Sequence, residues 1–233
     1  MKGGAVMNFF EILAYSFAVI TVIMTFLYQL APAFRKRLLI SKMLSSASFV
    51  LTGIFAAAVN PGIYAYCMLA ALLLCFTGDF FLDYKPKTFF VGVAFFSLGH
   101  MTYISTFLKV CTPSLTPDII HMVILFFAVV LMGIAHIKMD KIRFEGKHKI
   151  MYLYSLILII SFVVAATRGI NSAIGGNTAF GVCLALGGGM FMVSDAFLAS
   201  QLYGVPKIKR TDVGVAVTYF PAQALFALSI LFR

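Results

Sequence analysis

Two aspartates occur in matching sequence contexts, Gly78-Asp79-Phe80-Phe81-Leu82 and Ser194-Asp195-Ala196-Phe197-Leu198. Each lies near the end of an apolar run that is long enough to cross a bilayer, where an unpaired carboxylate is unfavourable by about 2.5 to 3.5 kcal/mol on insertion scales. Carboxyl groups at such depth are typical of functional sites, because a protonated one can donate a proton and an ionised one can accept it. We therefore expect Asp79 and Asp195 to share a polar site between helices.

Other polar side chains interrupt the neighbouring apolar runs. They are Lys42, Asp83, His100, Ser194, Tyr219 and Gln223. Spacings of four residues place Asp83 on the helix face of Asp79, and Gln223 on that of Tyr219. Pro221, between the latter two, frees a backbone carbonyl one turn back. These residues fall at mid-membrane or in the half nearest the basic loops, so we expect their cavity to open toward that half.

Two further patterns indicate how the helices pack. Residues Lys42, Ser45, Phe49 and Thr52 follow helical spacing and form a largely polar stripe that should face inward rather than lipid. Small residues recur every four positions at Gly181, Ala185 and Gly189. Such a pattern predicts that a neighbouring helix approaches closely and fixes the backbone that carries Asp195.

The composition predicts the class of protein that positions these residues. Hydrophobic residues make up 62% of the 233-residue chain, charged residues only 11%, and the mean hydropathy is +1.01, which excludes an ordinary soluble protein. Spans of about 20 apolar residues are expected at 8–31, 38–59, 63–83, 88–109, 118–137, 150–167, 178–203 and 212–232. We predict an all-α bundle of eight transmembrane helices that forms a single integral membrane domain, residues 1–233.

The two aspartate pentapeptides also suggest an internal repeat. A shift of 116 positions superimposes Asp79 on Asp195, as expected for two four-helix halves related by an axis along the membrane normal. The remaining residues align poorly at that shift, since His100 falls on Ala216. A chance echo in a chain rich in Phe and Leu explains the match equally well, and both interpretations stay open.

Basic residues predict the orientation. Thirteen of the 18 follow the first, third, fifth and seventh spans, namely Arg35, Lys36, Arg37, Lys85, Lys87, Lys138, Lys141, Arg143, Lys147, Lys149, Lys207, Lys209 and Arg210. The opposite side holds Lys2, Lys109, Arg168 and Arg233. By the positive-inside rule, the basic loops are cytoplasmic and both termini lie outside. We expect an integral protein of the bacterial plasma membrane, without affinity for nucleic acid.

Several segments together resemble a known family. They are Leu72 to Leu82, Phe95 to His100 with Tyr103 and Phe107, Phe191 to Ala199, and Tyr219 with Gln223. In order and spacing they resemble the lysoplasmalogenase-like (YhhN) family of eight-span membrane proteins over most of the chain. That family commonly has Lys-Pro near the start of its second span, whereas here Lys42 is followed by Met43.

The resemblance implies a reaction: characterised members hydrolyse the vinyl ether bond of lysoplasmalogens, without a cofactor. A lysophospholipid from the bilayer would be the substrate. Such cleavage needs an acid, a base for water and negative charge near a cation. We expect Asp195 to be the acid, Asp79 the base or stabiliser, and His100 to orient or shuttle a proton. Lys42 is expected to bind phosphate or balance Asp79; Tyr219, Gln223, Ser194 and Asp83 complete the candidate substrate-binding set.

Simpler interpretations accompany each role. Lys42 and Asp79 also fit a buried ion pair that fixes helix register, His100 a core histidine, and Asp83 the membrane interface. Metal ligation by Asp79, His100 and Asp195 lacks a supporting ligand spacing, and we predict no metal. The rival functions are a small proton- or cation-coupled transporter and a non-catalytic lipid-binding protein.

Overall fold

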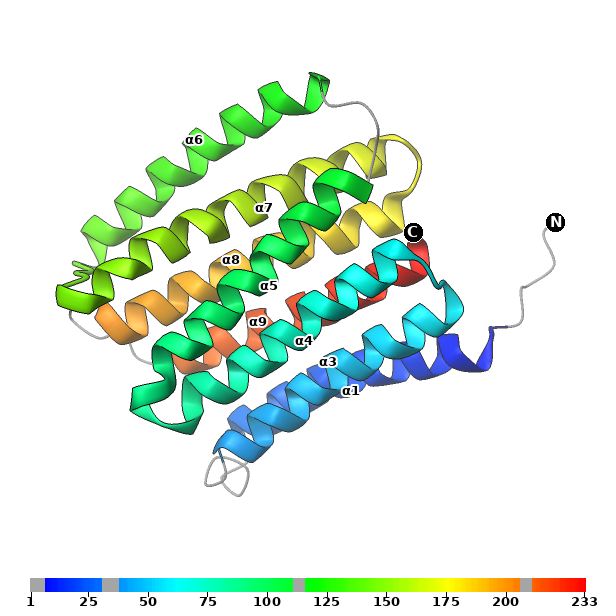
Figure 1. The fold of residues 1–233 in the computed structure, drawn as a ribbon, viewed down its shortest axis with the longest axis horizontal. Helices are drawn as coiled ribbons and strands as arrows, with labels where there is room; N and C mark the ends of the chain where they lie inside the picture. Colours follow the sequence, from blue (N-terminus) through cyan, green and yellow to red (C-terminus); the bar gives the residue numbers. More distant parts are fainter. Residues whose placement is uncertain (1–6, 31–37, 111–115, 206–210) are drawn as a thin grey trace.

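The computed structural model describes residues 7–30, 38–110, 116–205 and 211–233, and these form eight long helices and two short 3-10 turns without a strand (Figure 1). The helices are α1 (Phe9–Leu30), α3 (Leu38–Val59), α4 (Ile63–Tyr84), α5 (Phe89–Val110), α6 (Thr116–Met139), α7 (Ile150–Ile174), α8 (Thr178–Tyr203) and α9 (Thr211–Phe232). Each is long and apolar enough to cross a membrane. The predicted all-α bundle of eight spans is confirmed.

Seven of the eight predicted spans agree with the helices to within about two residues, but the predicted end of the sixth is wrong. Helix α7 continues to Ile174, seven residues beyond position 167. Arg168 was taken as the start of a loop, yet its side chain is 1% exposed within the helix. A long basic side chain can be buried by packing, so its charge does not by itself end a helix.

Helix α9 packs against α1, α3, α4 and α8, and α7 packs against α8. Helices α4 and α5 pack together, α3 contacts α4 and α9, and α1 contacts α3 and α9. Helix α6 lies at the edge and packs mainly on α7, as Figure 1 shows. Most of its side chains are therefore exposed, which suits a helix that faces lipid on most sides.

The small residues of α8 allow α7 to approach closely, as predicted. A Cβ atom built on Gly181 would lie 2.4 Å from the carbonyl oxygen of Gly169, and one built on Gly169 would lie 2.7 Å from the nitrogen of Ala185. Gly189 differs, because a Cβ there would meet its nearest neighbour, Phe162, at an ordinary 3.6 Å. The closest approach is thus made by Gly169 and Gly181, of which only the second was predicted, and a Cβ on Gly188 would also lie only 2.9 Å from Cβ of Ala165 on α7.

The described basic loops lie at one end of the bundle, where α4 joins α5 and α6 joins α7, on the left in Figure 1. Helix α1 begins and α9 ends at the opposite end. Arg35, Lys36, Arg37, Lys207, Lys209, Arg210 and Lys2 lie outside the described residues. Which end faces the cytoplasm stays a prediction.

Successive helices pack on one another in both halves of the chain, α1 to α5 and α6 to α9. An internal repeat requires such packing, but short connections produce it as well. The 4+4 repeat therefore stays a prediction.

The loop between α6 and α7 is more than the charged connection that the sequence suggested. Its Ile142 and Phe144 are buried and form a small apolar cluster with Met151. Phe89 and Phe90 of α5 and Tyr203 of α8 pack against this cluster. The loop therefore covers the basic end of the bundle between α5, α7 and α8.

Candidate active site

A cavity of about 740 Å³ lies in the half of the bundle nearest the described basic loops. Its walls come from α4 to α9, from Lys42 on α3 and from the apolar loop cluster around Phe144. Six of the eight predicted site residues line it: Lys42, Asp79, Asp83, Ser194, Asp195 and Tyr219. Its volume falls within the usual range of small-molecule sites, roughly 300 to 1,000 Å³.

Lys42 of α3 lies between two carboxylates of α4. Its Nζ is 2.7 Å from Oδ2 of Asp83 and 3.3 Å from Oδ1 of Asp79. Asp79 is 1% exposed, whereas the Asp83 side chain is 32% exposed. Since one cation is shared by two anions, Lys42 is already neutralised, and the geometry favours its role as counter-ion over phosphate binding.

Asp79 also accepts two hydroxyl hydrogen bonds. Ser46 on α3 donates to its Oδ2 at 2.6 Å, and Tyr219 on α9 donates to the same oxygen at 2.8 Å. With Lys42 beside Oδ1, side chains of two neighbouring helices, α3 and α9, hold this carboxylate. These contacts satisfy a charged carboxylate in a buried site, because each places positive charge or a donor proton against it.

The network continues from Tyr219 away from the cavity. Nε2 of Gln223 donates to the Tyr219 hydroxyl at 3.4 Å, and Tyr103 on α5 donates to Oε1 of Gln223 at 2.7 Å. Gln223 is fully buried and does not line the cavity. It therefore positions Tyr219 rather than reaching a ligand.

Glycines bring α4 and α5 together beside Asp79. A Cβ atom built on Gly92 would lie 2.8 Å from the backbone nitrogen of Leu82 and 3.0 Å from the carbonyl oxygen of Gly78. Any larger residue at Gly92 would push the helices apart next to Asp79. The polar stripe of α3 faces inward as predicted, since Ser45, Phe49 and Thr52 are buried.

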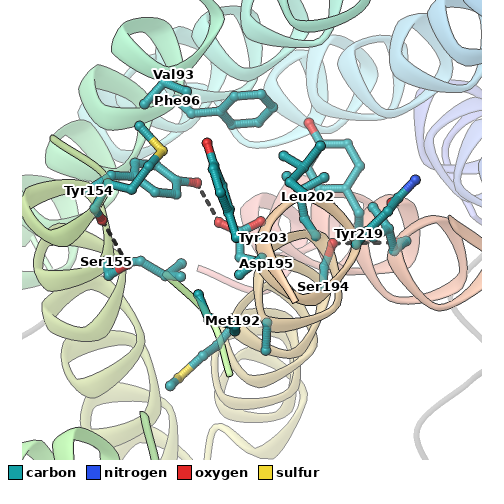
Figure 2. A pocket seen from close by; sticks show the side chains of 18 of the residues that line it. Val93, Phe96, Tyr154, Ser155, Met192, Ser194, Asp195, Leu202, Tyr203 and Tyr219 are labelled. Atoms are coloured by element: carbon teal, nitrogen blue, oxygen red, sulfur yellow. Dashed lines mark hydrogen bonds between the residues drawn. The ribbon is translucent and has the colours of Figure 1, made fainter. Parts of the chain in front are cut away.

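Asp195 of α8 has a different environment. The hydroxyl of Tyr154 on α7 donates to its Oδ2, and Figure 2 shows the two side chains pointing toward one another. Among the described residues no Lys, Arg or His side chain forms a salt bridge with Asp195. The neighbouring Ser194 donates to the carbonyl oxygen of Val215 on α9 at 3.3 Å and so links these helices.

Sequence reasoning missed Tyr154. It lies one turn into α7, where a tyrosine is usually interpreted as a membrane-interface anchor. Only the packing of α7 on α8 shows that its hydroxyl reaches Asp195. Ser46 was missed because it lies one position away from the stripe that was singled out.

His100 of α5 is buried behind the cavity wall and does not line the cavity. Its Nδ1 lies 3.1 Å from Oγ of Ser161 on α7, and its ring packs edge-on against Phe191 with centroids 4.4 Å apart. Tyr154 and Tyr103 are further aromatic neighbours, at 6.1 and 6.4 Å between ring centroids. The geometry therefore places His100 behind the Tyr154 and Asp195 pair rather than against a ligand.

A serine, a histidine and an aspartate also meet where α6 reaches α8. Oγ of Ser200 donates to Oδ2 of Asp140 at 2.6 Å and lies 3.1 Å from Nε2 of His136. In a hydrolytic triad the serine bonds to histidine and the histidine to aspartate. Here the serine bonds directly to the aspartate and is 1% exposed, so the trio fastens α6 to α8.

The described residues contain no group of three or more His, Cys, Asp or Glu side chains arranged to hold a metal ion.

In comparisons with known proteins, no curated protein and no solved structure matches the chain. The informative match is to a family model, which covers residues 37–230 and so most of the sequence. The chain therefore belongs to the YhhN family.

Proposed function

We propose that this membrane protein hydrolyses the vinyl ether bond of lysoplasmalogen-type lipids, releasing a fatty aldehyde and a glycerophospho-alcohol. One observation carries the proposal: Asp79 and Asp195 line a single cavity at membrane depth, and their carboxyl groups have contrasting environments. Asp79 has a cation and two hydroxyl donors, whereas Asp195 has a phenol donor. Membership of the YhhN family supports the same reaction class.

The first step is protonation of the alkene. Asp195 has the environment of a neutral acid, because a carboxylate without a cation is unfavourable at this depth. It donates its proton to the alkene carbon that is not bonded to oxygen, which leaves an oxocarbenium ion and the Asp195 carboxylate. Tyr154 holds Oδ2 of Asp195, so Oδ1 is the oxygen that faces the substrate.

The second step is capture of the cation by water. Asp79, held ionised by Lys42, Ser46 and Tyr219, stabilises the positive charge and accepts a proton from the attacking water. The product is a hemiacetal. Its collapse moves a proton from Asp79 to the departing ether oxygen and returns the hemiacetal hydroxyl proton to Asp195, which restores both groups. Glycosidases divide two carboxyl groups between similar roles.

The test is an assay of the purified protein in detergent. Lysoplasmalogen is the substrate, the ester-linked lysolipid of the same headgroup is the control, and aldehyde release is measured. We expect aldehyde from the vinyl ether and no hydrolysis of the ester. A protein with Glu145→Gln, an exposed carboxyl-to-amide change in the α6–α7 loop, serves as the matched variant and should keep full activity. Absence of aldehyde from folded wild-type protein would overturn the proposal.

A further inference from the structure

The cavity extends beyond its carboxyl groups into a region lined by apolar side chains. This apolar arm consists of Val130, Gly133 and Ile134 of α6, Leu156 and Ile159 of α7, and Met192 of α8. Met192 and Asp195 are three residues apart and so share one face of α8. The arm therefore begins about one helical turn from the carboxyl group that we propose as the acid.

The arm opens on the side of the bundle. Ile134 and Leu156 line the cavity, yet they remain 46% and 41% exposed. They belong to α6 and α7, and the outer surface of membrane-spanning helices faces hydrocarbon. Helix α6 is fastened to α8 by polar contacts of His136 and Asp140, all near its last turn. Away from that end, α6 packs mainly on α7.

We propose that the apolar arm binds the hydrocarbon chain of the lipid, which enters laterally beside α6, and that Gly133 sets the length of chain accepted. The identity of the substrate rests on the proposed function. In a vinyl ether the double bond is the first bond of the chain, so an acid that protonates it must have the chain beside it. The position of the arm next to Asp195 meets this requirement.

Gly133 is the residue through which the arm can be altered. A Cβ atom built on it would have no neighbour within 4 Å, so a side chain there has room and occupies space in the arm. The arm spans from Val130 to Ile134 along α6, about 6 Å of helix rise. A phenylalanine near its middle shortens the space that a chain can use.

The experiment uses a non-hydrolysable alkyl-ether lysolipid with a photoreactive diazirine at the end of its chain. After irradiation, labelled residues are identified by mass spectrometry, with excess unlabelled lipid as competitor. The label that excess unlabelled lipid suppresses should fall on α6, α7 and α8 around the arm. Gly133→Phe should reduce it at least threefold and shift hydrolysis toward shorter chains. Met132→Phe, whose native side chain is 67% exposed and outside the arm, should change neither.

A second variant covers the case in which Gly133→Phe does not fold. Ile134→Ala enlarges the arm and should shift hydrolysis toward longer chains. The proposal that the arm binds the chain would be overturned if the label that competitor suppresses lay on α1 or α3, or if folded Gly133→Phe were labelled as strongly as the wild type. Either result would leave the hydrolase proposal intact. Labelling of the arm without cleavage of any vinyl ether would support the arm as the chain-binding site and would overturn the hydrolase proposal.

Discussion

In the proposed mechanism the transferable proton belongs to the carboxyl group of Asp195, which lines the cavity and accepts a hydrogen bond from Tyr154. Replacing it with asparagine keeps its size and its ability to accept from Tyr154 but removes the proton. We predict that Asp195→Asn lowers turnover by a factor on the order of 10² to 10⁴. The prediction is checked by measuring aldehyde release by the variant, whose melting temperature should equal that of the wild type. Full activity in the folded variant would contradict the carboxyl mechanism.

Asp79 and Asp83 share the Lys42 cation, so removing Asp79 and removing Lys42 should lower the stability of the protein by different amounts. Asp79→Asn leaves Lys42 with Asp83 at 2.7 Å, so no buried charge loses all its partners. Lys42→Met leaves Asp79, which is 1% exposed, without its cation. Since an uncompensated buried charge costs roughly 3 to 5 kcal/mol, we predict that Lys42→Met destabilises the protein clearly more than Asp79→Asn. Thermal unfolding of both variants in one detergent measures the difference, and equal melting temperatures would contradict it.

At the scale of elements, one glycine pair, Gly169 and Gly181, makes the closest approach between α7 and α8. Gly181→Ala would place its Cβ 2.4 Å from the Gly169 oxygen, which is backbone and cannot move aside alone. We predict that Gly181→Ala lowers the free energy of unfolding by about 1 to 3 kcal/mol, the usual range for overpacking. Gly189→Ala is the control, because its Cβ meets Phe162 at 3.6 Å. Thermal unfolding compares them, and similar stability of the two variants would refute the role of the pair.

Helix boundaries followed from the sequence because the lengths of apolar runs are a direct requirement of the bilayer. The end of α7 did not, since burial of Arg168 depends on neighbouring helices. The carboxylates were identifiable because charge is rare at such depth. Tyr154, Ser46 and the loop residues Ile142 and Phe144 were not, because tyrosine, serine and apolar side chains are ordinary in a membrane chain. Their importance depends on which helices are neighbours.

At the scale of the molecule, the described basic loops share one end of the bundle and the chain's last helix finishes at the other. We predict that a cysteine replacing exposed Lys147 is labelled by a membrane-impermeant reagent only from the cytoplasmic side, and one replacing Arg233 only from outside. The four native cysteines are removed first, and intact and opened vesicles are compared. Labelling of both positions from one side would contradict the topology.

The cavity reaches the basic end of the bundle at Asp83, which is 32% exposed, and the lateral surface at Ile134. Cleavage of a lysolipid at its ether bond yields one product for each opening. The glycerophospho-alcohol carries a charged phosphate and partitions to water, whereas the aldehyde keeps the hydrocarbon chain and partitions to the bilayer. In the proposed reaction neither product would block the release of the other, and the reactive aldehyde would be dispersed among the hydrocarbon chains of the bilayer.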